Sequence, residues 1–117
     1  MELVALNQFT GSQTFTRWTP ISNSVLTEGA LYVADQAGAY WLFDAIQSHL
    51  DETKADWAQT VLTVNNDDSA ELVMTNGNDD PLSSQKVPFT DFPQKQITIW
   101  SVRNELGAHT HMLPSEY

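Results

Sequence analysis

The chain of 117 residues contains no cysteine, and only 5 of its residues are Lys or Arg. The missing cysteine excludes disulfides, thiolate catalysis and cysteine-based zinc sites. The 5 bases stand against 15 Asp and Glu, which gives a formal net charge of −10. Because electrostatic binding to nucleic-acid phosphates requires clustered Lys and Arg, we expect no direct nucleic-acid binding.

Long apolar runs are also missing. The chain begins with an acidic residue, Glu2, and its first apolar run, Leu3–Leu6, is shorter than the core of about 7 to 15 residues that a signal peptide needs. The longest apolar stretch elsewhere, residues 37–43, falls far below the roughly 20 residues that span a bilayer. We therefore expect a cytoplasmic protein with no targeting segment and no membrane partner.

The common catalytic and phosphate-binding motifs do not occur either. There is no Gly-x-Ser-x-Gly elbow, no Gly-x-Gly-x-x-Gly turn and no Gly-Lys-Ser/Thr phosphate loop. These absences favour a protein that is not an enzyme, and they predict no cofactor and no catalytic residue.

The residues that are present are sufficient for one hydrophobic core. Hydrophobic residues make up 41% of the chain and aromatic residues 10%. We expect a single α+β domain over residues 1–117, with a helical part over about residues 1–52 and a strand-rich part over about residues 57–117.

Two helices are indicated most clearly. Thr27 is a good N-cap residue, and Gly38 is well placed to end the helix that follows it. An apolar stripe at helical spacing then runs from Ala39 to Leu50, with Asp44, Gln47 and Ser48 expected to point away from the core. Glu2–Phe9 adds a third, shorter candidate, so we predict two or three helices.

The strands are indicated by β-forming residues between turn signals. Strands joined by short turns pair antiparallel, which predicts a four- to five-stranded meander with the helices packed on one face. The expected strands are Trp57–Val64, Ala70–Thr75, Ser83–Val87, Gln96–Val102 and Ala108–Leu113.

Five acidic residues near the strand turns form the first candidate site. No Lys or Arg occurs between Lys54 and Lys86, and adjacent hairpin ends would bring these acids together at one end of the sheet. Such a surface would suit a basic protein partner. Solvated turns are the alternative explanation, because Asp tolerates left-handed backbone and bonds its own backbone. The candidate residues are Asp67, Asp68, Glu71, Asp79 and Asp80.

The pair His109 and His111 forms the second candidate site. Two His separated by one residue face the same side of a strand and could ligate a metal through their imidazole nitrogens. The spacing identifies no third ligand. The alternative is an exposed, partly solvated pair near the end of the chain.

Several segments stand out as a set: Gly38–Asp44 (GAYWLFD), Val87–Pro93 (VPFTDFP), Ile97–Trp100 and Leu113–Tyr117 (LPSEY). Together they resemble a family of small uncharacterised bacterial proteins, also carried by phages and plasmids, that is classed as a domain of unknown function. The resemblance spans nearly the whole chain but implies no activity and no catalytic residues. From the residues themselves we expect Leu113–Tyr117 to dock on the domain, because a disordered tail would have no need of Leu113 and Tyr117.

These observations favour a non-enzymatic, protein-binding accessory factor of the mobile-element type that acts on a basic partner. The alternative is a small ligand-binding or metal-dependent enzyme that uses His109, His111 and nearby carboxylates. A homodimer is left open, because exposed sheet edges and surplus aromatics can pair, but no feature of the sequence sets the stoichiometry.

Overall fold

The computed structural model describes residues 15–19, 22–76, 78 and 80–117, so the helix expected over Glu2–Phe9 lies outside the described residues. Within them, two α-helices and one six-stranded sheet form an α+β fold. The elements in chain order are β1 (Val25–Leu26), α1 (Glu28–Gln36), α2 (Tyr40–Thr53), β2 (Trp57–Val64), β3 (Ala70–Thr75), β4 (Pro81–Val87), β5 (Gln96–Arg103), β6 (His109–Met112) and the short 3₁₀ helix η2 (Pro114–Glu116).

Both predicted helices form where the sequence signals place them. The Thr27 hydroxyl accepts a hydrogen bond from the Ala30 backbone N–H at 3.3 Å and so caps α1. Gly38 follows α1 with a φ of 60°, a left-handed conformation that glycine adopts without strain. The apolar stripe of α2 is buried as expected, but Gln47 was expected to point outward and is instead only 9% exposed.

The sheet differs from the predicted meander in its strand count and its order. It has six strands in the order β1-β6-β5-β2-β3-β4, so β5 crosses back to pair with β2 rather than with β4. β1 is paired parallel to β6, and the other pairs are antiparallel. The reason lies in composition: β2 and β5 alternate apolar residues and belong at the centre, whereas β4 is mostly polar, starts with Pro81 and suits an edge.

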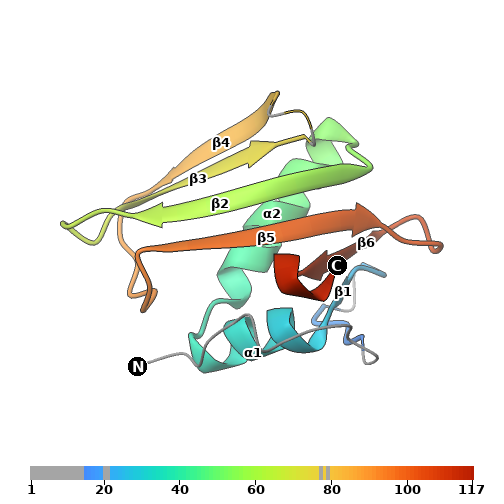
Figure 1. Ribbon diagram of the computed structural model, residues 1–117, viewed down its shortest axis with the longest axis horizontal. Helices are drawn as coiled ribbons and strands as arrows, with labels where there is room; N and C mark the ends of the chain where they lie inside the picture. The colour runs from blue at the N-terminus through green and yellow to red at the C-terminus, as the bar shows by residue number, and fades with distance from the viewer. Residues whose placement is uncertain (1–14, 20–21, 77, 79) are drawn as a thin grey trace.

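The helices cover one face of this sheet. Figure 1 shows α2 running behind the strands, with α1 along one side. The strand residues that face the helices alternate with half-exposed ones, as in the pattern of β5, where Ile97, Ile99 and Ser101 are buried. In the part of the chain that the structure describes, no helix is both long enough and apolar enough to cross a membrane.

The C-terminal segment docks on the start of α1, which confirms the expectation for Leu113–Tyr117. Leu113 is 2% exposed and the Glu116 side chain is buried. The Glu116 carboxylate accepts hydrogen bonds from the Thr27 hydroxyl (2.7 Å), the Gly29 backbone N–H (2.9 Å) and the Leu113 backbone N–H (2.9 Å). A Cβ at Gly29 would lie 2.6 Å from the Glu116 Oε1, so only glycine permits this close approach. The Glu116 carboxylate therefore satisfies a backbone N–H at the N-terminus of α1, where the helix dipole favours a negative charge.

Candidate functional site

The structure does not bring the predicted acidic residues together. Asp67 and Asp68 lie in the β2–β3 turn, whereas Asp80 lies in the β3–β4 turn. These turns stand at opposite ends of β3, because consecutive hairpins share one strand, and six residues of strand span about 20 Å. Glu71 is exposed at the start of β3, and Asp79 lies outside the described residues. The expectation of one acidic end of the sheet is therefore wrong.

The two acidic residues of the β2–β3 turn stabilise the conformation of the turn. The Asp67 carboxylate accepts hydrogen bonds from the Ser69 hydroxyl (2.6 Å) and the Ser69 backbone N–H (3.1 Å). These two hydrogen bonds lower the pKa of Asp67, and the bond from the Ser69 hydroxyl has the larger effect. Asp68 has a φ of 66°, which Asp tolerates better than most residues. Both acids thus have a local structural role in the turn.

His109 and His111 lie on the helix-facing side of β6, with their rings 6.4 Å apart and stacked. They are 3% and 0% exposed, so the pair is not the solvated one that the sequence left as an alternative. Gln47 of α2 lies against both rings. Its Nε2 is 3.4 Å from the His109 Nδ1, and its Oε1 is 2.9 Å from the His111 Nε2.

The directions of these hydrogen bonds can be assigned from the Asp51 carboxylate, which contacts the Gln47 amide. The Asp51 Oδ1 is 2.9 Å from the Gln47 Nε2 and can only accept, so it fixes the orientation of the Gln47 amide. The Gln47 Nε2 then also donates to the His109 Nδ1, and the His109 Nε2 donates to the Ala55 carbonyl at 2.8 Å. The Gln47 Oε1 accepts from the His111 Nε2. This pattern places a proton on the Nε2 of both imidazoles and makes the His109 Nδ1 an acceptor.

The surroundings of His111 favour the neutral form of its ring. The His111 Nδ1 accepts a hydrogen bond from the Ser101 hydroxyl at 2.7 Å, and the ring is enclosed by Trp18 and Phe43. Burial, with a smaller effect of the neighbouring His109, lowers the pKa of His111 to about 3. Because every ring nitrogen of the two His has a partner in the protein, the pair is part of a buried polar network.

No group of three or more His, Asp or Glu side chains that could hold a metal ion occurs in the part of the chain that the structure describes. The Ser101 hydroxyl and His111 ring are hydrogen-bonded, but both residues are fully buried and out of reach of a substrate. The arrangement around the His pair can therefore orient Gln47 and Asp51.

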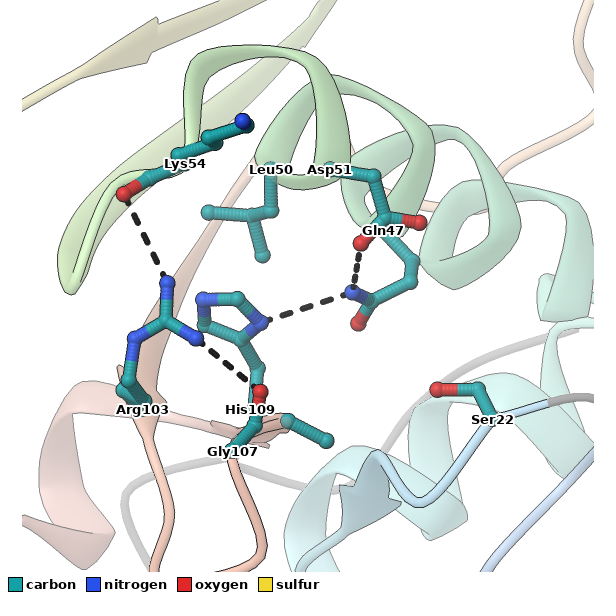
Figure 2. Close-up of a pocket in the computed structure, with 9 residues that line it drawn as sticks. Ser22, Gln47, Leu50, Asp51, Lys54, Arg103, Gly107 and His109 are labelled. Atoms are coloured by element: carbon teal, nitrogen blue, oxygen red, sulfur yellow. Dashed lines mark hydrogen bonds between the residues drawn. The ribbon is translucent and has the colours of Figure 1, made fainter.

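Two adjoining hollows run beside α2, and we call them together the α2 cleft. One has a volume of about 390 Å³ and lies between α2 and the β5–β6 loop; Figure 2 shows Gln47 and Asp51 on one side of it and Ser22 across from them. The other has a volume of about 370 Å³ and continues toward Trp18 and Asp44. The residues common to both hollows are Ser22, Gln47 and Asp51.

The two ends of the α2 cleft differ in charge. The end near Trp18 is lined by the carboxylates of Asp44 and Asp51, and no Lys or Arg is found among its described lining residues. The Trp18 indole N–H donates to the Asp44 Oδ1 at 2.8 Å and fixes that carboxylate in place. We call this end the acidic hollow.

The other end carries Lys54 and Arg103, but the charge of Arg103 is already paired. Its Nε donates to the Asp56 Oδ1 at 2.5 Å. Its terminal nitrogens donate to the carbonyls of Gly107 (2.9 Å) and Lys54 (3.5 Å), and Figure 2 shows these two bonds. Arg103 therefore ties the β5–β6 loop to the end of α2 and forms a wall of the cleft.

Sequence reasoning missed the acidic hollow. The signal was visible in part, since Asp44, Ser48 and Asp51 stand on one side of a predicted amphipathic helix. What could not be read from the sequence is that Trp18 and Ser22, far away in the chain, form the opposite wall.

The fold and the cleft define a small α+β protein with an open, mostly antiparallel sheet and a polar cleft beside α2. The chain matches the family of unknown function (DUF6876) over residues 2–117, and it belongs to that family. The expected membership in a family of unknown function is thereby confirmed. No curated protein and no solved structure matches the chain.

Proposed function

We propose that this protein is a non-enzymatic binding protein that holds a basic side chain of a protein partner in the acidic hollow of the α2 cleft. One observation carries the proposal: Asp44 and Asp51 line the same concave site, with no base among its described lining residues. A Lys or Arg side chain would place its charged head between the two carboxylates and its aliphatic stem against Trp18.

The hydrogen bonds around the hollow support this role. Trp18 holds Asp44, and Gln47 holds Asp51, so both carboxylates are oriented before a partner arrives. Gln47 is in turn held by the rings of His109 and His111. Preorganised charges lose less side-chain entropy on binding than mobile ones do. The buried network therefore acts as the support of a surface site.

The strongly negative charge of the chain supports the same proposal, because opposite charge accelerates encounter with a basic partner and this effect weakens as salt rises. The resemblance to phage- and plasmid-borne proteins supports an accessory role of the mobile-element type in the cytoplasm. The turn acids Asp67 and Asp80 lie at opposite ends of β3 and outside the hollow, so they provide the matched comparison in the experiment.

The experiment uses small basic probes and two matched variants. The probes are Nα-acetyl-arginine amide and its uncharged citrulline analogue, followed by NMR with the Trp18 indole N–H as the reporter. Asp44→Asn/Asp51→Asn removes two charges from the hollow, yet Asn can still accept the hydrogen bonds of Trp18 and Gln47. Asp67→Asn/Asp80→Asn removes two charges from the turns.

We expect the arginine probe to shift the Trp18 signal with a millimolar dissociation constant, which corresponds to a binding free energy of about −4 kcal/mol. The citrulline probe should give no shift. The hollow variant should lose the response and the turn variant should keep it. A response that maps to the turns, or none up to about ten times that concentration, would overturn the proposal. Capture of proteins from a native lysate at low and high salt then identifies the partner.

A further inference from the structure

In the part of the chain that the structure describes, neither α1 nor α2 covers the opposite face of the sheet, and we call it the open face. Figure 1 shows the strands on the near side of α2, with the short helix η2 and the C-terminus next to β5. In β2 and β5 the residues on this side alternate with the buried ones and are only partly covered by their neighbours. The open-face residues of these two central strands are Trp57, Gln59, Val61, Thr63, Gln96, Thr98, Trp100 and Val102.

A cluster of aromatic rings lies on the two central strands of the open face, toward the end where β2 begins. The ring of Trp100 lies 5.6 Å from that of Trp57 and 5.4 Å from that of Tyr117, measured between centroids. The Trp100 indole N–H donates to the Gln59 Oε1 at 3.1 Å, so the polar atom of the indole is satisfied within the protein. Tyr117 remains 79% exposed. Such clusters of Trp and Tyr are typical of the energetic centre of protein interfaces.

The open face is also nearly free of charge, in a chain whose net charge is −10. None of its residues on β2 or β5 is charged. Among the flanking described strands, only Glu71 and Lys86 on this side carry charge. They stand opposite each other in the β3–β4 register, so their charges cancel. The excess negative charge of the described chain therefore lies on the helix side, in the turns and at the rim.

We propose that the open face is the surface through which two copies of this chain form a dimer. A basic partner would be drawn to the acidic parts of the surface and would gain nothing from this uncharged face. For a second copy, with the same charge of −10, the open face is where contact brings no like-charged side chains together. A two-fold axis through it places the two aromatic clusters against each other, because such an interface uses the same patch on both subunits.

The size of the open face fits a weak dimer. The five strands β2 to β6 hold between 4 and 8 residues each, so about 3.3 Å per residue and about 4.8 Å between strands give a patch of roughly 500 Å² on each copy. The total of about 1,000 Å² lies at the lower limit of specific interfaces, so we expect a dissociation constant in the micromolar range. The dimer does not depend on the proposed function, because the α2 cleft lies on the helix side of the sheet.

The response to salt separates this proposal from the basic-partner proposal. Salt screens the repulsion between two acidic bodies, so dimerisation should strengthen as salt rises. Binding of a basic partner should instead weaken. The two proposals can therefore fail or succeed independently in the same buffers.

The experiment is sedimentation velocity of the whole chain at about 10 to 200 μM, in about 50 mM and 500 mM salt. Thr98→Glu puts one negative charge in the middle of the open face, and Gln36→Glu puts the same charge on the exposed part of α1. Thermal melts check that both variants fold. We expect a dimer that strengthens at high salt, that Gln36→Glu leaves unchanged and that Thr98→Glu weakens at least about tenfold, because an unpaired buried charge is costly.

The absence of native cysteine permits a second, direct readout. Thr98→Cys should be cross-linked to covalent dimers by a short bismaleimide at high salt, whereas Gln36→Cys should stay monomeric. A chain that is monomeric at every concentration and salt, or a dimer that Thr98→Glu leaves intact, would overturn the proposal.

Discussion

His111 should make the protein unusually sensitive to mild acid. Its pKa is lowered to about 3 in the folded state, against 6.5 for the free side chain. Between these two values the unfolded chain binds a proton at this position and the folded chain does not. Stability is therefore fully present above pH 6.5 and is lost as the pH falls below it, and the loss continues down to about pH 3.

The magnitude follows from the same two values. Each pH unit below 6.5 costs about 1.36 kcal/mol of unfolding free energy, so a fall to pH 4.5 costs about 2.7 kcal/mol. For a domain of this size, such a loss lowers the melting temperature by about 10 °C.

The measurement is urea unfolding followed by tryptophan fluorescence at pH values from 7.5 to 4.5. The matched control is His111→Gln, whose amide can still donate to Gln47 but does not titrate. Carboxylates contribute equally to both proteins, so the difference between the two curves isolates His111. Its expected slope is about 1.36 kcal/mol per pH unit below 6.5.

Two parallel curves would refute the reasoning. A second observation keeps the test decisive if the variant does not fold: the NMR signal of the His111 ring in the native protein should not move between pH 7.5 and 4.5. A titration with a midpoint near 6.5 would show that the imidazole is charged in the folded state.

The remaining predictions concern stability. Gly29→Ala should cost about 2 to 4 kcal/mol in urea unfolding, because the new Cβ would lie 2.6 Å from the Glu116 Oε1 and 2.7 Å from the Leu113 Cδ1. Glu116→Ala should cost about 3 kcal/mol, because it leaves the donors of Thr27, Gly29 and Leu113 without this acceptor. The double variant should cost much less than the sum, and an additive double-mutant cycle would contradict the proposed clash. Lys54→Gly should stabilise the protein by about 0.5 to 1 kcal/mol in the same assay, since Lys54 ends α2 with a left-handed φ of 57°; an unchanged or lower stability would count against it.

Local signals in the sequence were enough for most of the elements. Thr27 as an N-cap, Gly38 after the first helix and the alternation of Gln96–Val102 each depend on residues within one or two turns of chain. Such short-range chemistry acts in the same way whatever the rest of the chain does. The docking of Leu113–Tyr117 was also predicted, because apolar residues at a chain end need a partner.

Gln47 and the His pair show where this reasoning fails. A glutamine between charged and apolar helix positions is normally exposed, and only the approach of β6 to α2 gives its amide two imidazoles to bond. The strand order fails for a similar reason, since the pairing of β5 with β2 is decided by which strands best fill the centre of the sheet.

The net charge of −10 was determined by the sequence alone, because it is a sum over residue types, and it led to the prediction of a basic partner. The positions of those charges were decided by the tertiary structure. It separates Asp67 and Asp68 from Asp80 by the length of β3, and it places Asp44 and Asp51 across from Trp18. It also leaves an uncharged aromatic face on the sheet. Long-range pairing creates these surfaces, and contacts between residues distant in the chain leave no periodic signal in the sequence from which they could be read.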